Sequence, residues 1–291
     1  MIPAQFDYVA PASVAEAVTA LSEAGEDAKV LAGGQSLIPV LRLRLSYPTV
    51  LVDLRKIGDL RGVREEGSEL VIGAMTRHAD VVTDQLIRQY AALVAEATAT
   101  VADPAVRHRG TFGGALAHAD PAGDLAAVAL ALDAQLVAEG PGGRRTIAAA
   151  EFFLDYLQTS LSPDEVLVEV RLPKLEGQWG VAYEKFNRTA QAWAIVGAAV
   201  AVRRDNGSLA ESRVALTNMG STPVRARAVE AALSGAAADA GTIREAASHA
   251  AEGTNAPSDL SGASDYREHL ARVLTERALV KAAGISAAQG F

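Results

Sequence analysis

Two glycine-rich segments carry the clearest chemical signal in the sequence: Ala32-Gly33-Gly34-Gln35-Ser36 and Thr111-Phe112-Gly113-Gly114-Ala115. Adjacent glycines let the backbone adopt positive φ and remove the Cβ atoms that would keep a ligand away. Successive N–H groups in such turns can converge on a phosphate oxygen, and the hydroxyls of Ser36 and Thr111 can donate to phosphate as well. A single segment of this kind could be an ordinary tight bend. Two of them predict a ligand with two phosphates, a dinucleotide, held between two lobes.

The composition excludes several other kinds of chemistry. With 49% hydrophobic and 21% charged residues over 291 positions, the chain is typical of a soluble globular protein of two or three domains. Its formal net charge of −8 argues against a nucleic-acid partner, which needs a basic surface. The sequence has no cysteine, which removes disulfides, thiolate nucleophiles and cysteine-ligated metal centres, and its five histidines lack metal-binding spacing. We therefore expect no metal on this chain.

The sequence also lacks the usual targeting signals. No basic region precedes an apolar run at the N-terminus, so no signal peptide is expected. The longest apolar stretch, 193–202, is about half as long as a membrane-spanning helix needs to be. We expect a cytoplasmic protein without a membrane span.

The elements that must position the glycine segments begin with a small β-α-β unit over residues 1–55. Ser13 followed by Glu16 forms a capping box, which predicts a helix with its apolar face on Val14, Ala17, Val18 and Leu21. A strand over 29–32 leads into the first glycine segment, and another is predicted over 50–54.

The next region, 56–176, alternates strands and helices around the second glycine segment. Strands are expected over 70–73 and 165–172, and a helical run over 87–99. Residues 125–132 are apolar nearly all round, which indicates a buried helix. Residues 140–143 predict the loop of a hairpin.

A boundary is predicted near 174–180, where proline, glycine and polar residues gather. Beyond it, strands over 194–203 and 211–218 are joined through Asn206-Gly207, a strong hairpin signal. The strongest late helix is expected over 265–283. The fold class is therefore mixed, α/β (α+β).

Taken together and in order, the motifs resemble those of the FAD-binding medium subunit of the molybdenum hydroxylases, the family of aerobic carbon monoxide dehydrogenase and xanthine dehydrogenase. The resemblance covers nearly the whole chain. Its motifs are the first glycine segment with Leu41-Arg42-Leu43-Arg44-Leu45 and Val52-Asp53-Leu54, then Gly73-Ala74-Met75-Thr76-Arg77-His78-Ala79, the second glycine segment with His118-Ala119-Asp120-Pro121 and Asp124, Lys185-Phe186-Asn187-Arg188, and finally Asn218-Met219-Gly220-Ser221-Thr222-Pro223-Val224-Arg225-Ala226.

The resemblance implies an architecture. Residues 1–176 would form an FAD-binding domain of the PCMH/vanillyl-alcohol-oxidase type, with lobes 1–55 and 56–176. Residues 177–291 would form a C-terminal α+β domain of the carbon monoxide dehydrogenase flavoprotein type.

It also implies an oxidoreductase subunit that passes electrons from iron–sulfur clusters, via FAD, to an external acceptor. The clusters would lie on a small partner subunit and molybdopterin on a large one, in a dimer of heterotrimers. The lack of cysteine fits a chain that carries only the flavin. A standalone flavin oxidoreductase and a non-redox nucleotide-binding protein of the same fold are the alternatives. The substrate (carbon monoxide, a purine, an aldehyde or an N-heterocycle) and the acceptor (NAD, a quinone or oxygen) remain open.

The family's cofactor positions carry over to this chain residue by residue, and none of them is a catalytic residue or a metal ligand. Residues 31–38 would wrap the pyrophosphate, the second glycine segment would close on it, and Asp124 would accept hydrogen bonds from FAD hydroxyls. Lys185 and Trp193 would lie near the flavin ring, and Val101 and Leu167 near the flavin or adenine. The full set is Leu31, Ala32, Gly33, Gly34, Gln35, Ser36, Leu37, Ile38, Val101, Thr111, Gly113, Gly114, Ala115, Asp124, Leu167, Lys185 and Trp193.

Several of these residues have a simpler interpretation. Asp124 could be the N-cap of the helix that follows it, and Lys185 could be a solvated surface lysine. Val101, Leu167 and Trp193 could pack in the core. We expect His78 and His118 to be structural or close to phosphate, because flavin electron transfer needs no general base on this chain.

Overall fold

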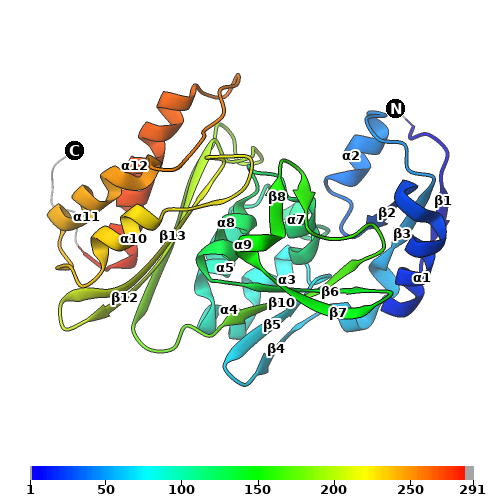
Figure 1. The fold of residues 1–291 in the computed structure, drawn as a ribbon, viewed down its shortest axis with the longest axis horizontal. Helices are drawn as coiled ribbons and strands as arrows, with labels where there is room; N and C mark the ends of the chain where they lie inside the picture. Colours follow the sequence, from blue (N-terminus) through cyan, green and yellow to red (C-terminus); the bar gives the residue numbers. More distant parts are fainter. Residues whose placement is uncertain (1, 286–291) are drawn as a thin grey trace.

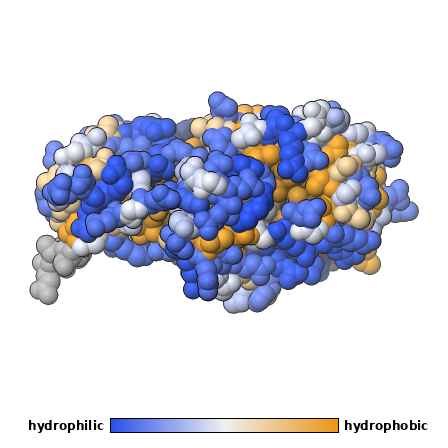
Figure 2. All heavy atoms as spheres, turned by 90° about the horizontal axis from the view of Figure 1, so that it is seen from below, coloured by the Kyte–Doolittle hydropathy of each residue, from blue (hydrophilic) through white to orange (hydrophobic). Residues whose placement is uncertain are grey.

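The computed structural model describes residues 2–285; the end of the predicted C-terminal domain, 286–291, lies outside the described residues. The three larger of the four β-sheets follow one another along the long axis of the molecule, from the blue N-terminal lobe at the right of Figure 1 to the C-terminal part at the left. The face seen from below is mostly hydrophilic, with hydrophobic surface between the N-terminal lobe and the middle of the molecule (Figure 2). The mixed α/β character expected from the sequence is confirmed.

The first sheet is parallel and has the order β1 (Asp7–Val9), β3 (Val50–Asp53), β2 (Ala28–Leu31). The predicted capping signal begins α1 (Val14–Ala24), since Ser13 Oγ accepts the Glu16 N–H at 3.2 Å. The Glu16 carboxylate reaches one residue further than in a standard capping box and accepts the Ala12 N–H at 2.8 Å. The chain leaves β2, passes through the first glycine segment and enters α2 (Leu37–Arg42).

The second sheet has five strands in the order β4 (Val63–Glu66), β5 (Glu69–Gly73), β10 (Val166–Pro173), β6 (Gln135–Gly140), β7 (Gly143–Ala148), and the pairings are antiparallel. The helical run predicted over 87–99 is two helices, because Ala91 leaves the helical region at φ −145° and ψ 47°. The elements that accompany this sheet are α3 (His78–Thr83), α4 (Gln85–Tyr90), α5 (Ala92–Ala99), α6 (Pro104–Arg107), α7 (Phe112–His118), α8 (Asp124–Ala131), α9 (Ala149–Phe152) and the hairpin of β8 (Phe153–Asp155) and β9 (Gln158–Thr159).

The third sheet is antiparallel and has the order β11 (Trp179–Phe186), β12 (Val196–Asp205), β13 (Ser208–Thr217), β14 (Val224–Arg225). The hairpin predicted at Asn206-Gly207 is confirmed, and both residues have positive φ, 48° and 85°. The helices of this part are α10 (Arg227–Leu233), α11 (Ala240–Ala247) and α12 (Ser264–Ala282), and short 3₁₀ turns lie at Gly25–Asp27, Leu54–Lys56, Gly58–Leu60 and Ser248–Ala251.

Helix α8 joins the second and third sheets, and this position explains why its sequence is apolar on every side. All eight of its residues are buried. Its apolar residues, 125–131, share one core with Leu136 of β6, Val170 of β10 and Ala201 of β12. The helix is also held at its C-terminal end, where Arg225 Nη1 donates to the Leu130 carbonyl oxygen at 2.7 Å. The N-terminus of α8 is therefore fixed between the two parts of the molecule.

Helix α1 joins the first and second sheets in the same way. Its buried residues Ala17 and Leu21 pack in a core with Val137 of β6 and Val168 of β10. No helix within residues 2–285 is both long enough and apolar enough to cross a membrane. The same residues include no group of three or more metal-binding side chains placed to hold an ion.

Candidate functional site

The two glycine segments lie against each other, although they are far apart in the sequence. A Cβ added to Gly33 would lie 2.4 Å from the Arg109 carbonyl oxygen and 2.7 Å from the Gly110 Cα. A Cβ added to Gly114 would lie 3.2 Å from the Ala32 Cβ. Since backbone atoms cannot move aside for a side chain, Gly33 is required for the first lobe to reach the second. The structure thus brings the predicted phosphate segments into one place.

The first glycine segment is an open turn with free donors. Gly34 has φ +75°, a conformation that favours glycine. Among the described residues, the N–H groups of Gly33, Gly34, Gln35 and Ser36 donate no hydrogen bond. Four consecutive free N–H groups next to a turn form the concave donor set that binds anions. This is the property that the sequence predicted for the segment.

The second glycine segment differs from the predicted turn. It is the start of α7: Thr111 is the N-cap, and its Oγ1 accepts the Gly114 N–H at 3.2 Å. The N–H groups of Phe112 and Gly113 donate to the carbonyl oxygens of Thr76 and Ala74, each at 2.9 Å. These donors are therefore already used within the chain, and the expectation of a second N–H turn was wrong.

Close packing accounts for the second glycine pair instead. A Cβ on Gly113 would lie 2.5 Å from the Ala74 Cβ, and one on Gly114 would lie 2.6 Å from Thr111 Oγ1. The hydroxyl hydrogen of Thr111 has no acceptor among the described residues, so Thr111 can still donate to a ligand. This segment therefore offers a ligand the hydroxyl of Thr111, and the glycines leave space because they have no side chains.

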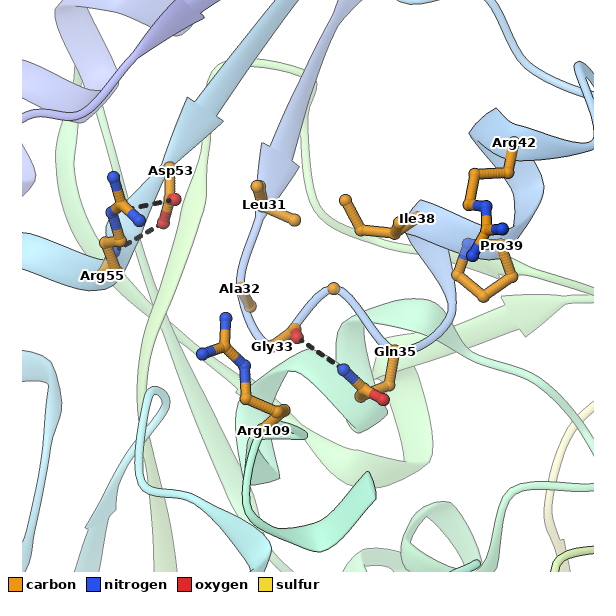
Figure 3. Close-up of a pocket in the computed structure, with 11 residues that line it drawn as sticks. Leu31, Ala32, Gly33, Gln35, Ile38, Pro39, Arg42, Asp53, Arg55 and Arg109 are labelled. Atoms are coloured by element: carbon orange, nitrogen blue, oxygen red, sulfur yellow. Dashed lines mark hydrogen bonds and ion pairs between the residues drawn. The ribbon is translucent and has the colours of Figure 1, made fainter. Parts of the chain in front are cut away.

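A cavity of about 300 Å³ lies beside the first glycine turn (Figure 3). The structure places six of the predicted residues on its wall. The predicted lining residues are Leu31, Ala32, Gly33, Gly34, Gln35 and Ile38; those that sequence reasoning missed are Pro39, Arg42, Asp53, Arg55 and Arg109. Ser36 belongs to the same turn, and Leu37 is the first residue of α2. Neither of them lines this cavity.

Two arginines give the cavity a positive charge. Within residues 2–285, the guanidinium groups of Arg42 and Arg109 have no hydrogen-bond partner and no carboxylate partner. Figure 3 shows them on opposite sides of the glycine turn. Asp53 is neutralised locally, since its carboxylate lies 3.4 Å from Arg55 Nε and accepts the Tyr8 hydroxyl at 2.7 Å. Free N–H groups and unpaired guanidinium groups together suit an anion with several oxygens.

A second group of predicted residues forms a buried polar cluster between α8 and β11. Lys185 Nζ lies 2.8 Å from Asp124 Oδ2, and the Tyr183 hydroxyl donates to Asp124 Oδ1 at 2.7 Å. The side chains of Lys185 and Asp124 are only 6% and 4% exposed. Burial raises the pKa of Asp124, although Lys185 and the hydrogen bonds oppose that shift. Burial and the Asp124 carboxylate raise the pKa of Tyr183 well above its usual value.

The structure overturns two of the simpler interpretations here. The N-cap of α8 is Gly123, so Asp124 is not a capping residue. Lys185 is not a solvated surface lysine, because its ammonium group is buried and also donates to the Thr100 carbonyl oxygen at 3.2 Å. The carboxylate that sequence reasoning left free is already paired with this lysine.

Trp193 is 53% exposed, so the alternative of a core tryptophan is wrong. Its ring centroid lies 6.4 Å from that of His118, with the planes tilted by 43°. Burial lowers the pKa of His118, and its Nε2 lies 4.0 Å from Asp120 Oδ2. An exposed indole beside a half-buried imidazole offers a flat aromatic surface next to α8.

Helix α7 connects the two groups of residues. Gly114, in its first turn, faces Ala32 of the first glycine segment, and His118, at its end, faces Trp193. A seven-residue helix is about 10 Å long. Phosphate donors therefore lie near one end of α7 and an aromatic surface near the other.

Two predicted residues lie outside both groups. Leu167 is buried in the core of the second sheet, as the packing alternative proposed. Val101 packs against the same core, and its carbonyl oxygen accepts from Arg107 Nη1 at 2.8 Å.

His78 supports the site from behind. A Cβ on Gly110 would lie 2.7 Å from the His78 ring, which fixes the backbone just before Thr111. Burial, assisted by the positive charge of Arg107, lowers the pKa of His78 to about 4. The imidazole is therefore neutral near neutral pH, which agrees with a structural role.

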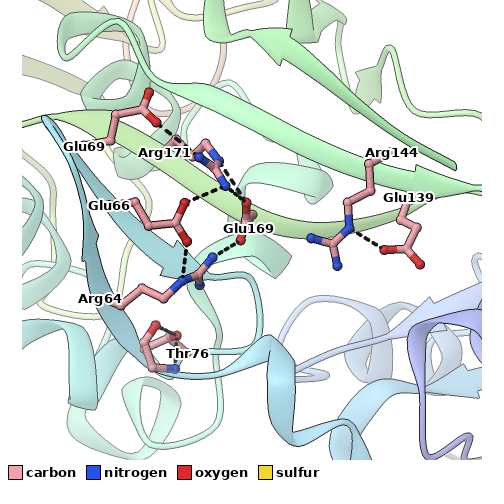
Figure 4. Close-up of polar contacts among 9 residues, drawn as sticks. Arg64, Glu66, Glu69, Thr76, Glu139, Arg144, Glu169 and Arg171 are labelled. Atoms are coloured by element: carbon pink, nitrogen blue, oxygen red, sulfur yellow. Dashed lines mark hydrogen bonds and ion pairs between the residues drawn. The ribbon is translucent and has the colours of Figure 1, made fainter.

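A second cavity, of about 360 Å³, is lined by residues of β5, β6, β7 and β10 in the second sheet, and Figure 4 shows the ion pairs among its charged side chains. Its charges are already paired: Glu169 accepts from Arg64 and Arg171 at 2.6 Å each, and Arg171 also lies 3.0 Å from Glu66. Burial alone would raise the pKa of Glu169, but these two arginines hold it below its usual range. These ion pairs link neighbouring strands of the sheet. The charged side chains around this cavity are therefore already paired with one another and do not form a site for a charged ligand.

Comparison with known proteins agrees with this geometry. Residues 4–175 match the family model for the FAD binding domain in molybdopterin dehydrogenase, and residues 181–282 match the CO dehydrogenase flavoprotein C-terminal domain. The carbon monoxide dehydrogenase medium chain of Hydrogenophaga pseudoflava is 43% identical over 279 residues, which are 96% of this chain and 97% of the relative. The glyceraldehyde dehydrogenase medium chain of Sulfolobus acidocaldarius is 32% identical over 283 residues, 97% of this chain and 100% of the relative.

Solved structures give the same answer. A carbon monoxide dehydrogenase chain from Hydrogenophaga pseudoflava superposes with a TM-score of 0.95 at 45% identity, covering 97% of this chain and 98% of its own. A chain of quinoline 2-oxidoreductase from Pseudomonas putida 86 superposes with a TM-score of 0.93 at 34% identity, covering 98% and 99%. The resemblance seen in the motifs is confirmed: the chain belongs to the FAD-binding medium subunits of the molybdenum hydroxylases and is an oxidoreductase component with FAD as its cofactor.

Proposed function

We propose that this chain receives electrons from iron–sulfur clusters on a small partner subunit and delivers them, through its FAD, to an external acceptor. The partners would be that small subunit and a large molybdopterin subunit, assembled as a dimer of heterotrimers. The observation that carries the proposal is the cavity beside Gly33, where four free N–H groups lie between two unpaired arginines. This donor set fits the pyrophosphate of FAD.

The residues of the chain then have separate tasks. Residues 31–38 and the Thr111 hydroxyl would hold the pyrophosphate, and Gly113, Gly114 and Ala115 would leave room beside it. The cluster of Asp124 and Lys185 and the indole of Trp193 would border the flavin ring. Bound FAD supplies the redox chemistry, since it can exchange one or two electrons. The protein's own groups bind and orient the cofactor and exclude water from it, and no proton-transfer residue is required.

The choice of substrate belongs to the large subunit. Relatives of this chain are the medium or FAD-binding chains of enzymes named for carbon monoxide, caffeine, glyceraldehyde and nicotine. One medium-chain fold thus serves substrates with little in common, which supports a role in electron transfer rather than in substrate recognition.

The domain division also remains a proposal: residues 1–176, with lobes 1–55 and 56–176, and residues 177–291. The 176/177 boundary falls between β10 and β11, which belong to different sheets. We propose a cytoplasmic location as well.

The electron route can be tested by anaerobic mixing of purified subunits. The FAD-loaded chain is mixed with the reduced small subunit, and bleaching of the visible flavin band is followed in a stopped-flow instrument. We expect fast bleaching with the small subunit and none with the large subunit alone. Flavin that stays oxidised beside the reduced small subunit would contradict the proposal. If the isolated chain oxidised a hydroxylase substrate by itself, it would instead be a standalone flavin oxidoreductase.

A further inference from the structure

The proposed function gives no task to the motif at 218–226, although the sequence resemblance includes it. Its first residue, Asn218, follows directly after β13 and has φ 62°. Glycine and asparagine adopt this left-handed conformation more readily than other residues. The backbone therefore favours one of these two residues here, and the side-chain amide is what distinguishes asparagine from glycine.

The amide of Asn218 holds the end of the loop that joins β11 to β12. Its Nδ2 donates to the carbonyl oxygens of Ala194 at 2.8 Å and Ile195 at 3.3 Å. Ile195 has further partners, since its N–H donates to the Phe186 carbonyl oxygen at 2.8 Å and its carbonyl oxygen also accepts from Arg267 Nη1. Within residues 2–285, the carbonyl of the buried Ala194 accepts from no other donor. Removal of the amide would therefore act mainly on Ala194.

The backbone of Asn218 is tied to the segment that precedes α8. Its N–H donates to the Pro121 carbonyl oxygen at 2.9 Å, and the Ala194 N–H donates to the Ala122 carbonyl oxygen at 3.4 Å. Asn218 thus bonds to the first segment through its main chain and to the second through its side chain. Residues 121–122 and 194–195 are held beside each other by this one residue and by the bond between them.

Trp193 lies directly next to these contacts. It precedes Ala194 in the chain, and a Cβ added to Gly123 would lie 3.9 Å from its Cζ3 atom. Gly123 is the N-cap of α8, one residue before Asp124. Because the indole is 53% exposed, core packing does not fix it. Its place beside α8 depends on how the backbone at Ala194 is held.

We propose that Asn218 is a positioning residue that holds Trp193 against the N-terminus of α8 and so fixes the aromatic surface beside the flavin ring. The inference rests on the proposed function, in which Trp193 borders the ring, and adds to it the residue that keeps the indole there. Asn218 acts through the backbone of Ala194 rather than by binding FAD itself.

The test uses the full chain with Asn218→Gly, which tolerates the positive φ but lacks the amide. Asn206→Gly is the matched control. Asn206 also has positive φ, 48°, lies at the opposite end of β12 and β13, and makes no side-chain hydrogen bond within residues 2–285. Each variant also carries Trp179→Phe, which leaves Trp193 as the one tryptophan of the chain.

Two quantities are measured: the fluorescence anisotropy of Trp193 without FAD, and the affinity for FAD from flavin fluorescence. We expect Asn218→Gly to lower the anisotropy, because the indole moves more freely. It should also weaken FAD binding about 3- to 10-fold, the effect of one lost hydrogen bond. Asn206→Gly should change neither quantity. Anisotropy in Asn218→Gly equal to that of the parent would overturn the inference.

A double-mutant cycle separates positioning from a general structural role. If Asn218 acts through Trp193, Asn218→Gly should weaken FAD binding no further in a chain that already carries Trp193→Ala. The same loss of affinity in both backgrounds would overturn the inference, because Asn218 would then act on FAD by another route.

A second variant covers the case in which Asn218→Gly does not fold, as judged by circular dichroism. Asn218→Asp is then measured in the same way, since aspartate also tolerates positive φ and its carboxylate cannot donate to the two carbonyl oxygens. The anisotropy is measured without FAD, so it does not depend on the cofactor. A chain that bound no FAD but showed the expected change at Trp193 would contradict the proposed function and support the positioning role.

Discussion

Replacing Lys185 with methionine should strongly destabilise the folded chain, because it leaves the buried Asp124 carboxylate without its partner. At 2.8 Å and an effective dielectric of about 20, the gross attraction between the two charges is about 6 kcal/mol. Desolvation of both groups offsets part of this. Removal of one member of a buried pair typically lowers the free energy of unfolding by about 3–5 kcal/mol. We expect a decrease of that size for Lys185→Met.

The assay is urea unfolding at saturating FAD, followed by circular dichroism. Lys281→Met is the control, since Lys281 is 55% exposed, lies 3.5 Å from Glu96 and should cost at most about 1 kcal/mol. Adding Asp124→Asn to Lys185→Met should restore most of the loss, because asparagine carries no charge and still accepts from Tyr183. If Lys185→Met lowered the free energy of unfolding by less than about 1 kcal/mol, the importance of the buried pair for stability would be refuted.

The same variant should have a distinct pH dependence. The native pKa of Asp124 is raised above its ordinary value of 3.8, mainly by burial. A carboxyl group of this kind stabilises the fold below the unfolded pKa and loses that contribution as the pH rises through the native pKa. Without Lys185 the native pKa of Asp124 should rise further. The deficit of Lys185→Met should therefore be small at acidic pH and grow toward neutral pH.

Three further predictions concern the cofactor site. Folding lowers the pKa of His78 from 6.5 to about 4. The free energy of unfolding should therefore fall by about 3 kcal/mol as the pH drops from 6.5 through 4, and urea titrations of His78→Gln should not show this loss. Gly33→Ala places a Cβ 2.4 Å from a carbonyl oxygen and should lower both stability and FAD content, whereas Gly142→Ala, with nothing within 4 Å, should change neither. Arg109→Ala removes a charged donor worth about 1.5–3 kcal/mol, so fluorescence titration should show FAD binding roughly 10- to 100-fold weaker; equal affinity to the Lys29→Ala control would exclude Arg109 from the site.

The sequence predicted the elements whose signals are local. The Ser13 cap, the Asn206-Gly207 hairpin and the all-round apolar helix at 125–132 depend on neighbouring residues or on periodicity, and each is confirmed. The first glycine turn also has the predicted conformation at Gly34.

What the sequence could not predict depends on residues that are distant along the chain. Arg109 belongs to the cavity only because Gly33 packs on its backbone. The sequence predicts a turn at Gly113, but glycine is required there because the backbone packs closely on Ala74, which no local pattern shows. Lys185 is buried because Asp124, 61 residues earlier, lies opposite it. The hint in the sequence was that an arginine lies near each glycine segment, Arg42 after the first and Arg109 before the second.

The most direct test of the central claim is the amount of flavin bound to the purified chain and its chemical form. The protein is expressed alone, denatured, and its released flavin is identified and counted against protein by absorbance and chromatography. We expect FAD rather than FMN, close to one per chain, and almost none in Gly33→Ala. A colourless chain that takes up no FAD on titration would contradict it.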